Sequence, residues 1–366
     1  MASIAFVAAE DPLPGISYTN TRLTVGPWSI HLVRLERGNP RYQIQSIHAG
    51  GRAVGLETLS DQVGHINSAA GTALAAINGD YYERENDYAG APRGLQVVDG
   101  ELLSAPSGEA CFWINALGEP HLQKVQSLFH VTWPDGTTNG FGLNGRRPAG
   151  GLELYTTEIG PSTHTEGGSE LVLTRAWAGP WLPLRVGQSY STRVQEIRQT
   201  GNTPLTSNMV ILSVDPAISR EVLAKIKPGD LLRISTDTQP ALHGVRMAMS
   251  GGPILLRDGR REKISAEPGQ SYEISSMAER HPRAAVAWNQ KYFFFVEVDG
   301  RQKGLSVGMT LDELEQWLST LGCDQAMNLD GGGSATLWYD GEVRNSPADR
   351  VEREIANGLV IIQKKR

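Results

Sequence analysis

Short β-prone runs of apolar residues recur along this chain, while the spacing typical of helices is rare. The runs 208–214 and 229–236 are examples, and turn residues bound them on both sides. Five Asp-Gly pairs separate similar runs, at 99–100, 135–136, 258–259, 299–300 and 340–341. Asp-Gly between alternating apolar residues is a strong hairpin signal. The pattern therefore predicts a chain dominated by β-hairpins.

Helical spacing is clearest between Thr310 and Gly322. Thr310 and Glu313 form a capping-box pattern, leucines and Trp317 recur on one face, and Gly322 ends the pattern. A second helix is predicted over 56–67 and a short third one over 219–226. These few helices among many strands predict an α+β fold, with a mixed β-sheet core flanked by a few helices and an inserted β-rich unit.

The chain has 366 residues, more than one hydrophobic core usually serves. We expect a β-rich N-terminal segment over 1–70 that packs on the core. The first part of a catalytic domain follows over 71–184, then the β-rich insertion over 185–240. The second part, over 241–366, carries the sequence NLDGGGS.

Composition excludes several classes of protein. The chain is 40% hydrophobic and 20% charged, and its net charge of -6 is spread without long runs of one sign. We therefore expect no nucleic-acid partner and no polybasic membrane anchor, and no apolar run is long enough to span a membrane. The oligomeric state stays open. The two cysteines, Cys111 and Cys323, could form one disulfide, but two buried thiols are favoured.

The opening sequence MASIAFVAAEDPLPG has a short apolar stretch that ends in small residues. It is either the remnant of a trimmed secretory signal or a frayed first strand. No clear signal peptide is present, and a secreted or periplasmic location is the expectation that we carry forward.

Two segments far apart in sequence end on the same pattern. Each has Ala, an apolar residue, Asn, one further residue and Asp, at 76–80 and at 326–330. Residues two apart on a strand face the same side, so Asn78 and Asp80 point together, as do Asn328 and Asp330. Either pair alone could simply end a strand. Together they predict neighbouring strands whose ends hold the two carboxyls within about 10 Å, the range of an inverting acid–base pair.

Three consecutive glycines follow Asp330. Gly331, Gly332 and Gly333 would let main-chain amides approach a ligand and form an anion-binding nest, and Ser334 adds a hydroxyl. No Gly-Lys-Ser/Thr follows, so this is not a Walker loop, and it is not a dinucleotide fingerprint.

A cation is expected beside this segment. Arg283 opens an apolar run, where a guanidinium would be costly unless it met a phosphate or a carboxylate, and a structural salt bridge is an equal alternative. His281 is a candidate ligand contact, although a lone histidine is more often structural. Gly252, in the pair Gly251-Gly252, either contacts a ligand or allows close backbone packing.

Seven motifs in order resemble the phosphodiester glycosidase family: AINGDYY, SGGPILLRDG, HPRAAVAW, VDGR, LSVGMTLDEL, NLDGGGSATL and REIANGLVI. They cover most of residues 70–362. Ala284 and the pair Ala287-Trp288 depart from the family, which usually has Thr and Gly there. The resemblance implies hydrolysis of a sugar 1-phosphodiester, with N-acetylglucosamine as the sugar in the best-known member, on a glycan or on a cell-wall or exopolysaccharide substrate.

Glycosyl transfer to water normally uses two carboxylates, and Asp80 and Asp330 are the pair we choose, with Asp299 or Glu352 as the reserve partner of Asp330. The substrate-binding residues would be Arg283, His281, Gly252, Asn78, Asn328 and residues 331–334. The chemistry requires no cofactor. Clustered carboxylates and amides would suit calcium in a structural role, and no Cys/His spacing indicates zinc. The alternatives are a glycosidase of a non-phosphorylated glycan and a non-catalytic glycan-binding module.

Overall fold

A computed structural model describes residues 13–24, 26–66, 71–224, 226–264 and 274–365. Strands account for 42% of the structure and helices for 12%, so the protein is mostly β. The expected α+β class is corrected in this respect: only two helices are substantial. The expected mixed β-core with few helices is present. The expectation of a strand or signal remnant in the opening residues lies outside the described residues.

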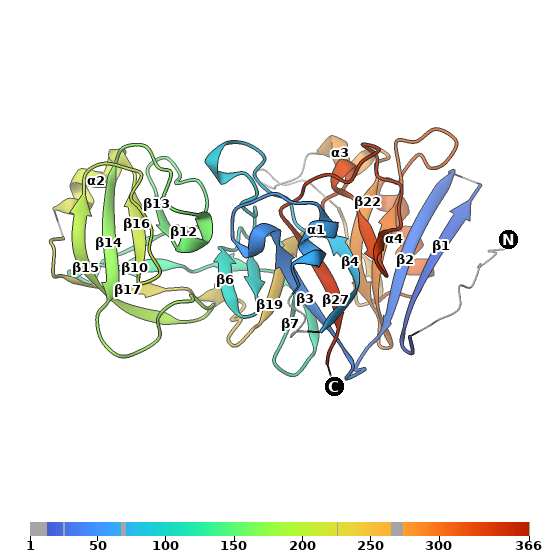
Figure 1. The fold of residues 1–366 in the computed structure, drawn as a ribbon, viewed down its shortest axis with the longest axis horizontal. Coiled ribbons are helices and arrows are strands. Elements are labelled where there is room, and N and C mark those ends of the chain that lie inside the picture. Colours follow the sequence, from blue (N-terminus) through green and yellow to red (C-terminus); the bar gives the residue numbers. More distant parts are fainter. Residues whose placement is uncertain (1–12, 25, 67–70, 225, 265–273, 366) are drawn as a thin grey trace.

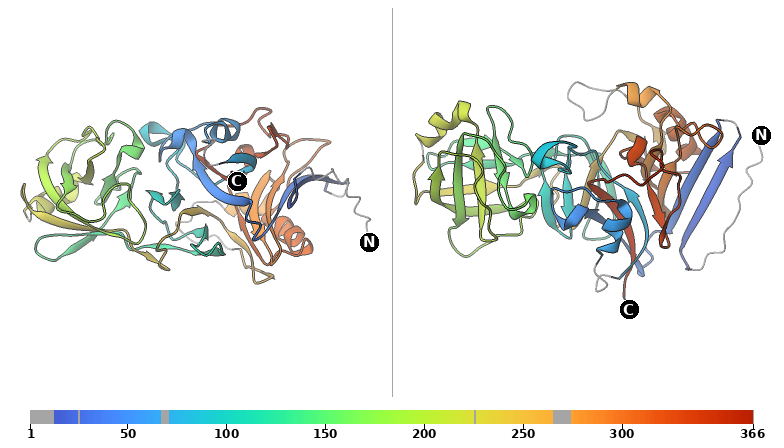
Figure 2. Two further views of the ribbon diagram at one scale, coloured as in Figure 1. Left: turned by 60° about the horizontal axis from the view of Figure 1, so that its bottom comes forward. Right: turned by 45° about the horizontal axis from the view of Figure 1, so that its top comes forward.

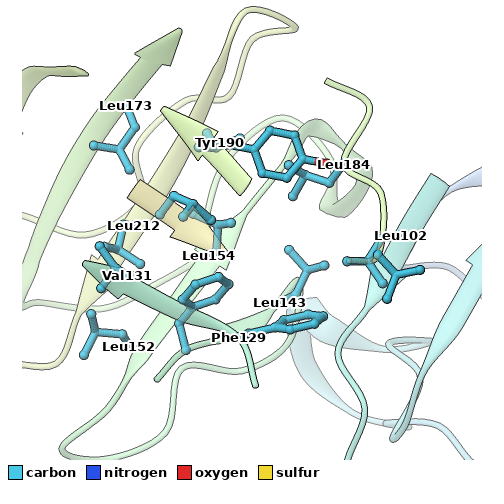
Figure 3. Close-up of a cluster of buried hydrophobic side chains, with 14 of the residues drawn as sticks. Leu102, Phe129, Val131, Leu143, Leu152, Leu154, Leu173, Leu184, Tyr190 and Leu212 are labelled. Carbon is cyan, nitrogen blue, oxygen red and sulfur yellow. The ribbon is translucent and has the colours of Figure 1, made fainter. Parts of the chain in front are cut away.

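One end of the molecule is an eight-stranded mixed sheet that curls into a nearly closed barrel (Figure 1, left). Its interior is filled by large apolar side chains, among them Leu154, Leu173 and Tyr190 (Figure 3). The order of its strands is β11-β10-β17-β15-β14-β16-β13-β12. Their bounds are β10 His130–Thr132, β11 Thr138–Gly140, β12 Gly142–Leu143, β13 Leu152–Tyr155, β14 Ser169–Arg175, β15 Ser189–Arg198, β16 Met209–Val214 and β17 Leu231–Ser235.

The opposite end is a seven-stranded sheet that begins with the N-terminal hairpin (Figure 2). Helix α4 (Leu311–Thr320) packs on one face of this sheet through Leu311, Leu314 and Leu318. In spatial order the strands are β1 Ile16–Leu23, β2 Trp28–Glu36, β23 Tyr292–Val298, β22 Arg283–Trp288, β24 Gln325–Asn328, β20 Ile254–Arg257 and β21 Arg260–Arg261.

Two five-stranded sheets lie between these ends, and their apolar side chains share a core with the second face of the seven-stranded sheet. The first has the order β6-β5-β19-β7-β8, and the second has the order β26-β25-β4-β27-β3. A two-stranded ladder joins β9 to β18. The bounds are β3 Tyr42–His48, β4 Thr72–Asn78, β5 Gln96–Val98, β6 Glu101–Ser104, β7 Ala110–Ile114, β8 Pro120–Lys124, β9 Gln126–Ser127, β18 Thr238–Gln239, β19 Met247–Gly251, β25 Leu337–Tyr339, β26 Glu342–Val343 and β27 Asn357–Gln363.

The predicted helix at 310–322 is confirmed. The Thr310 hydroxyl accepts from the Glu313 amide at 3.1 Å, and the Glu313 carboxylate accepts from the Thr310 amide at 2.9 Å. The other two predicted helices are displaced or shorter. Helix α1 is Leu59–Gly64, and α2 is Pro216–Leu223, which begins earlier than expected because Asp215 caps it and Pro216 suits the first turn. A short α3 (Ile274–Ala278) was not predicted.

Four of the five Asp-Gly pairs form hairpins, between β5 and β6, β10 and β11, β20 and β21, and β25 and β26. The exception is Asp299-Gly300, which was predicted wrongly. It leads from β23 into a loop, because the Asp299 carboxylate is buried and accepts from the Ser346 amide at 2.6 Å instead of closing a turn.

Both cysteines are free and buried, so the preference for thiols is confirmed. Among the helices that the structure describes, none is long and apolar enough to cross a membrane. The barrel strands run from His130 to Ser235 and so include much of the predicted insertion at 185–240. The four domain boundaries themselves stay predictions.

Candidate active site

The ends of β4 and β24 meet although the two strands belong to different sheets. The Asp330 amide donates to the Gly79 carbonyl at 2.9 Å, and the Asn78 side chain donates to the Asp330 carbonyl at 2.6 Å. The prediction that the strands are neighbours in one sheet is therefore wrong, because β4 pairs with β25 and β27 while β24 pairs with β22 and β20. The prediction that their polar ends meet is confirmed.

Asp80 is a buried carboxyl with one unpartnered oxygen. Its Oδ1 accepts from the Tyr81 amide at 2.8 Å, whereas Oδ2 is buried without a hydrogen bond of normal geometry to any described residue. Burial raises the pKa of Asp80 to about 8, the negative charges of Asp330 and Glu109 add to the rise, and hydrogen bonds from the Tyr81 and Gly94 amides oppose it. Asp80 is therefore a carboxylic acid at neutral pH that can donate a proton.

Asp330 lies in a more polar setting. Burial raises its pKa, but Ser334, Arg84, the Gly331 amide and Arg353 all lower it. No cation is among the main influences on the pKa of Asp80, so the surroundings of Asp330 favour the ionised form more than those of Asp80 do. Ser334 Oγ lies close enough to influence Asp330, yet it forms no hydrogen bond of normal geometry with a described residue. Two carboxyls with unequal environments are what acid–base chemistry requires.

The two asparagines of the repeated pattern are held by main-chain groups. Asn78 uses both ends of its side chain, since its Oδ1 also accepts from the Thr336 amide at 3.0 Å. The side-chain Nδ2 of Asn328 donates to the Gly252 and Leu329 carbonyls at 2.9 and 2.7 Å. Its Oδ1 is buried without a hydrogen bond to the described residues. Their positions favour holding the strand ends over contacting substrate, with Asn328 Oδ1 as the open acceptor.

The glycine run is used for close packing. The Gly331 amide donates to Asp330 Oδ1 at 2.9 Å, the Gly332 amide to the Pro282 carbonyl at 2.9 Å, and the Ser334 amide to the Gly331 carbonyl at 3.2 Å. An open nest of successive amides, as the sequence predicted, is therefore not formed. A Cβ on Gly331 would lie 2.7 Å from the Pro282 carbonyl oxygen, and one on Gly333 would overlap the Arg353 and Asp349 side chains. Gly252 likewise bonds to the backbone, through its amide to the Asn328 carbonyl at 2.8 Å.

Arg283 is a buried guanidinium, 4% exposed, at the start of β22. Its Nε donates to the Met309 carbonyl at 2.8 Å, and its Nη2 donates to the Ser276 and Glu279 carbonyls. Among the described residues no carboxylate forms an ion pair with it, so the alternative of a structural salt bridge has no support there. Burial lowers the pKa of Arg283 to about 10. A guanidinium without a carboxylate partner carries a positive charge that a bound anion can offset.

Arg301 extends this positive region and was not predicted. It donates to His281 Nδ1 at 3.1 Å, and its guanidinium lies against Gly332. His281 also approaches Glu279 at 3.4 Å, and burial together with the charges of Arg283 and Arg301 lowers its pKa. Arg301 was missed because the preceding Asp299-Gly300 was interpreted as a hairpin turn.

Three further residues beside the carboxyls were missed: Arg84, Arg353 and Asn357. The Asn357 side chain accepts from the Asp80 amide at 2.7 Å, and the two arginines lower the pKa of Asp330. Arg353 and Asn357 both lie in the motif REIANGLVI, which was the available signal.

The reserve candidates have other roles: Glu352 accepts from the Ser60 amide at 2.8 Å, and Asp299 pairs with His31. Within the described residues, the cluster with metal-ligand spacing is His31, Glu297 and Asp299, and it includes neither Asp80 nor Asp330.

Comparison with known proteins identifies a family domain in the second half of the chain. Residues 187–362 match the family model described as phosphodiester glycosidase. Residues 187–362, just under half of the chain, form a phosphodiester glycosidase family domain. Asp330, Arg283, Arg301 and Arg353 lie inside the matched residues of the phosphodiester glycosidase domain, whereas Asp80 lies before them.

Three proteins similar to this chain have names that state no activity. The uncharacterized protein YomE of the SPbeta prophage of Bacillus subtilis (strain 168) is 28% identical over 119 residues, which span 32% of this chain and 18% of that protein. A hypothetical protein from Synechocystis has the same fold, with a TM-score of 0.76, 21% identity, and coverage of 96% of this chain and 62% of that one. A Burkholderia pseudomallei protein named "Putative exported protein" matches with a TM-score of 0.70 and 22% identity, over 92% of this chain and 74% of that one.

Proposed function

We propose that this protein hydrolyses the glycosidic bond of a sugar 1-phosphodiester in a glycan or in a cell-wall or exopolysaccharide substrate. The observation that carries the proposal is the pairing of a protonated Asp80 with a more readily ionised Asp330, beside the guanidinium groups of Arg283 and Arg301. Two unequal carboxyls serve glycosyl transfer, and guanidinium groups without carboxylate partners serve a phosphate. The family of the matched domain supports the same chemistry.

In this mechanism Asp80 is the acid. The bond between the anomeric carbon and the bridging phosphate oxygen breaks, and the electron pair stays on that oxygen, which Asp80 protonates. A phosphate is a better leaving group than an alkoxide and needs less protonation, so the two arginines add electrostatic stabilisation to the proton transfer from Asp80. Arg283 is fixed by three carbonyls, which holds its charge in place during the reaction.

Asp330 acts in its ionised form, as a base toward water or as a nucleophile toward the anomeric carbon. The hydroxyl of water ends on the sugar, and its proton replaces the one that Asp80 gave up. Asn78 and Asn357 hold the main chain of Asp330 and Asp80, respectively, and so fix the relative position of the carboxyls. Water and the sugar phosphodiester are the reactants, and Asp80 and Asp330 supply the acid–base groups without a cofactor.

The test compares two substrates that share the same sugar, an aryl sugar 1-phosphodiester and a neutral aryl glycoside. We expect turnover of the phosphodiester, and a loss of about 10²–10⁴-fold in Asp330→Asn with an unchanged melting temperature. The exposed hairpin variant Asp340→Asn is the matched control. Turnover of the glycoside alone would identify a glycosidase of non-phosphorylated glycans, and binding of a glycan without turnover of either substrate would identify a binding module.

We also propose that the protein acts outside the cytoplasm, in the periplasm or as a secreted protein. A cell-wall or extracellular polysaccharide substrate is found there, and one protein of the same fold has a name that describes export. Fractionation of the source cells, with the activity assayed in each fraction, checks this location.

A further inference from the structure

We propose that His31, Glu297 and Asp299 bind a first-row divalent transition-metal ion, such as Mn²⁺ or Zn²⁺, at a structural site separate from the Asp80–Asp330 pair. One ligand atom from each of the three side chains lies within 4.8 Å of the others. His31 on β2 and Glu297 on β23 face each other directly across the antiparallel ladder. Asp299 follows two residues after Glu297, and its amide continues the ladder to the Ser29 carbonyl at 3.0 Å, so both carboxylates point to one side.

The cluster is almost completely buried, with exposures of 5% for His31, 0% for Glu297 and 1% for Asp299. The cluster lies on the face of β2 that also carries Val33, which packs in the core between the sheets. Ile30 and Leu32 lie on the opposite face of β2, toward helix α4. Two carboxylates in such a setting are costly unless a positive charge offsets them. Among the described residues His31 is the only basic group that forms an ion pair with either of them.

Glu297 is the residue that points to a ligand. Both of its carboxylate oxygens are buried without a hydrogen bond to any described residue. Asn345 lies near Glu297 but forms no hydrogen bond of normal geometry with it. Asn345 is also engaged elsewhere, because it bonds to the Leu337 amide at 2.9 Å and the Ala335 carbonyl at 3.1 Å. A cation between Glu297 and Asp299 would use the two Glu297 oxygens that the described residues leave unpaired.

The donor set selects the class of ion. Calcium prefers six to eight oxygen ligands, whereas one imidazole with two carboxylates suits manganese, zinc or iron. Tyr18 Oη lies 2.7 Å from His31 Nδ1, so it can fix the tautomer that presents Nε2 to the ion, as outer-shell partners of metal-bound histidines do. His31 Nε2 now lies 2.9 Å from Asp299 Oδ2. Bond lengths of about 2.1 Å to each donor require shifts of roughly 1 Å or less.

The site supports both loops that carry arginines to the candidate active site. Asp299 Oδ1 accepts from the Ser346 amide at 2.6 Å, at the start of the segment that carries Asp349 and Arg353. The Asp299 carbonyl accepts from the Ser306 hydroxyl, which closes the loop that carries Arg301. An ion bound to Asp299 would therefore stabilise the base of both loops without contacting substrate.

The experiment measures metal content and stability. Protein stripped with a chelator is dialysed against Mn²⁺, Zn²⁺ or Ca²⁺ at equal concentration, and bound metal is counted by mass spectrometry. We expect one equivalent of Mn²⁺ or Zn²⁺ and a rise in melting temperature of about 5 °C at a hundred times the dissociation constant. Calcium should give a smaller rise. Nitrogen coupling in the pulsed electron paramagnetic resonance spectrum of the Mn²⁺ protein should report His31.

Glu297→Gln should fold, because Gln has the shape of a protonated Glu, and it should bind the ion at least about 100-fold more weakly. Glu315→Gln is the matched control, since Glu315 is equally buried and pairs with Arg261 away from the cluster. Absence of stoichiometric metal in the unmodified protein would overturn the proposal. So would equal binding by Glu297→Gln, or a manganese spectrum without nitrogen coupling.

Discussion

The side chain of Asn78 donates a hydrogen bond of 2.6 Å to the main-chain carbonyl of Asp330. The two residues end strands of different sheets, so no ladder of main-chain bonds holds them together. Three other hydrogen bonds replace such a ladder. Two join the Asn78 side chain to Asp330 and Thr336, and the third joins the Asp330 amide to the Gly79 carbonyl. The position of Asp330 relative to Asp80 therefore depends on the buried Asn78 carboxamide together with the main-chain bond to Gly79.

Asn78→Ala should reduce both stability and activity. The change leaves the Asp330 carbonyl and the Thr336 amide buried without partners, which costs roughly 2–5 kcal/mol in the free energy of unfolding. Denaturant unfolding gives the stability, and kcat/KM on the sugar phosphodiester gives the activity. Asn144→Ala is the control, because Asn144 bonds in the same way to Leu103 and Thr156 inside the barrel. If both variants keep full activity at equal destabilisation, Asn78 does not position Asp330.

The repeated Asn-x-Asp pattern shows what the sequence can and cannot predict. The two-residue period correctly brings the Asn and the Asp of each strand toward one place, because alternation along a strand is a local property. Which strands pair is a property of the whole fold. The sequence between the two copies contains the barrel and parts of three sheets, and no local signal specifies that β25 and β27, rather than β24, lie beside β4.

The arginines and the glycine run illustrate a second limit. Arg283 was found because it is a lone charge in an apolar run, but Arg301 follows an Asp-Gly pair that is elsewhere a hairpin signal. The open nest predicted at 331–333 is not formed, because the Gly331 amide bonds to Asp330 Oδ1 and the Gly332 amide bonds to the Pro282 carbonyl. The Pro282 carbonyl lies close to Gly332 only once β22 and β24 have paired. Contacts of that kind are fixed by tertiary packing and not by composition.

Asp80→Asn should remove activity and the alkaline limb of the pH profile. Asp80 must be protonated to act as the acid, and its pKa is about 8, so kcat/KM of the unmodified protein should fall as the pH rises through about 8. The variant should lose about 10²–10⁴-fold and show no transition there. Steady-state rates between pH 5 and 10 provide the measurement. An alkaline limb that persists in the variant would assign the titration to another group.

The same variant should change how stability depends on pH. The folded pKa of Asp80, about 8, lies above the ordinary pKa of 3.8, so between these two pH values the folded protein holds a proton that the unfolded chain has released. Stability from this group is full below about pH 4 and is lost as the pH rises toward 8, by at most about 1.4 kcal/mol per pH unit. Asp80→Asn should therefore gain in melting temperature relative to the unmodified protein across that window. Glu153→Gln, whose parent carboxyl also has a pKa raised to about 8 by burial, should show the same gain with normal activity.

Two alanine variants separate the roles within the glycine run. In Gly331→Ala the new Cβ meets the Pro282 carbonyl at 2.7 Å, and because backbone yields little, we expect a loss of roughly 1–3 kcal/mol in stability. In Gly333→Ala the Cβ meets the side chains of Arg353 and Asp349, which can move apart. That variant should keep its stability and lose activity, since Arg353 is displaced from Asp330. Thermal melts and kcat/KM check both, and the reverse order of stabilities would contradict the packing described here.

Arg301→Gln should distinguish a phosphate-binding site from a general glycan site. Arg301 is exposed and lies beside Gly332 and His281, so its loss should leave the melting temperature unchanged. If its guanidinium binds the phosphate, KM for the aryl sugar phosphodiester should rise about tenfold, which is the value of one charged hydrogen bond, while a neutral aryl glycoside should be unaffected. The exposed Arg260→Gln in the β20–β21 hairpin is the control for a simple change of net charge.

Arg283→Lys completes this comparison, because Arg283 is buried and fixed. A lysine ammonium cannot reach the Met309, Ser276 and Glu279 carbonyls in the geometry of the fork, so we expect a loss of roughly 1–3 kcal/mol in stability together with weaker binding of the charged substrate. The ratio of kcat/KM for the phosphodiester to that for the glycoside is the decisive measurement. It should fall in both arginine variants and stay constant in Arg260→Gln. A ratio unchanged by Arg301→Gln and Arg283→Lys would mean that the positive region holds the fold and does not bind phosphate.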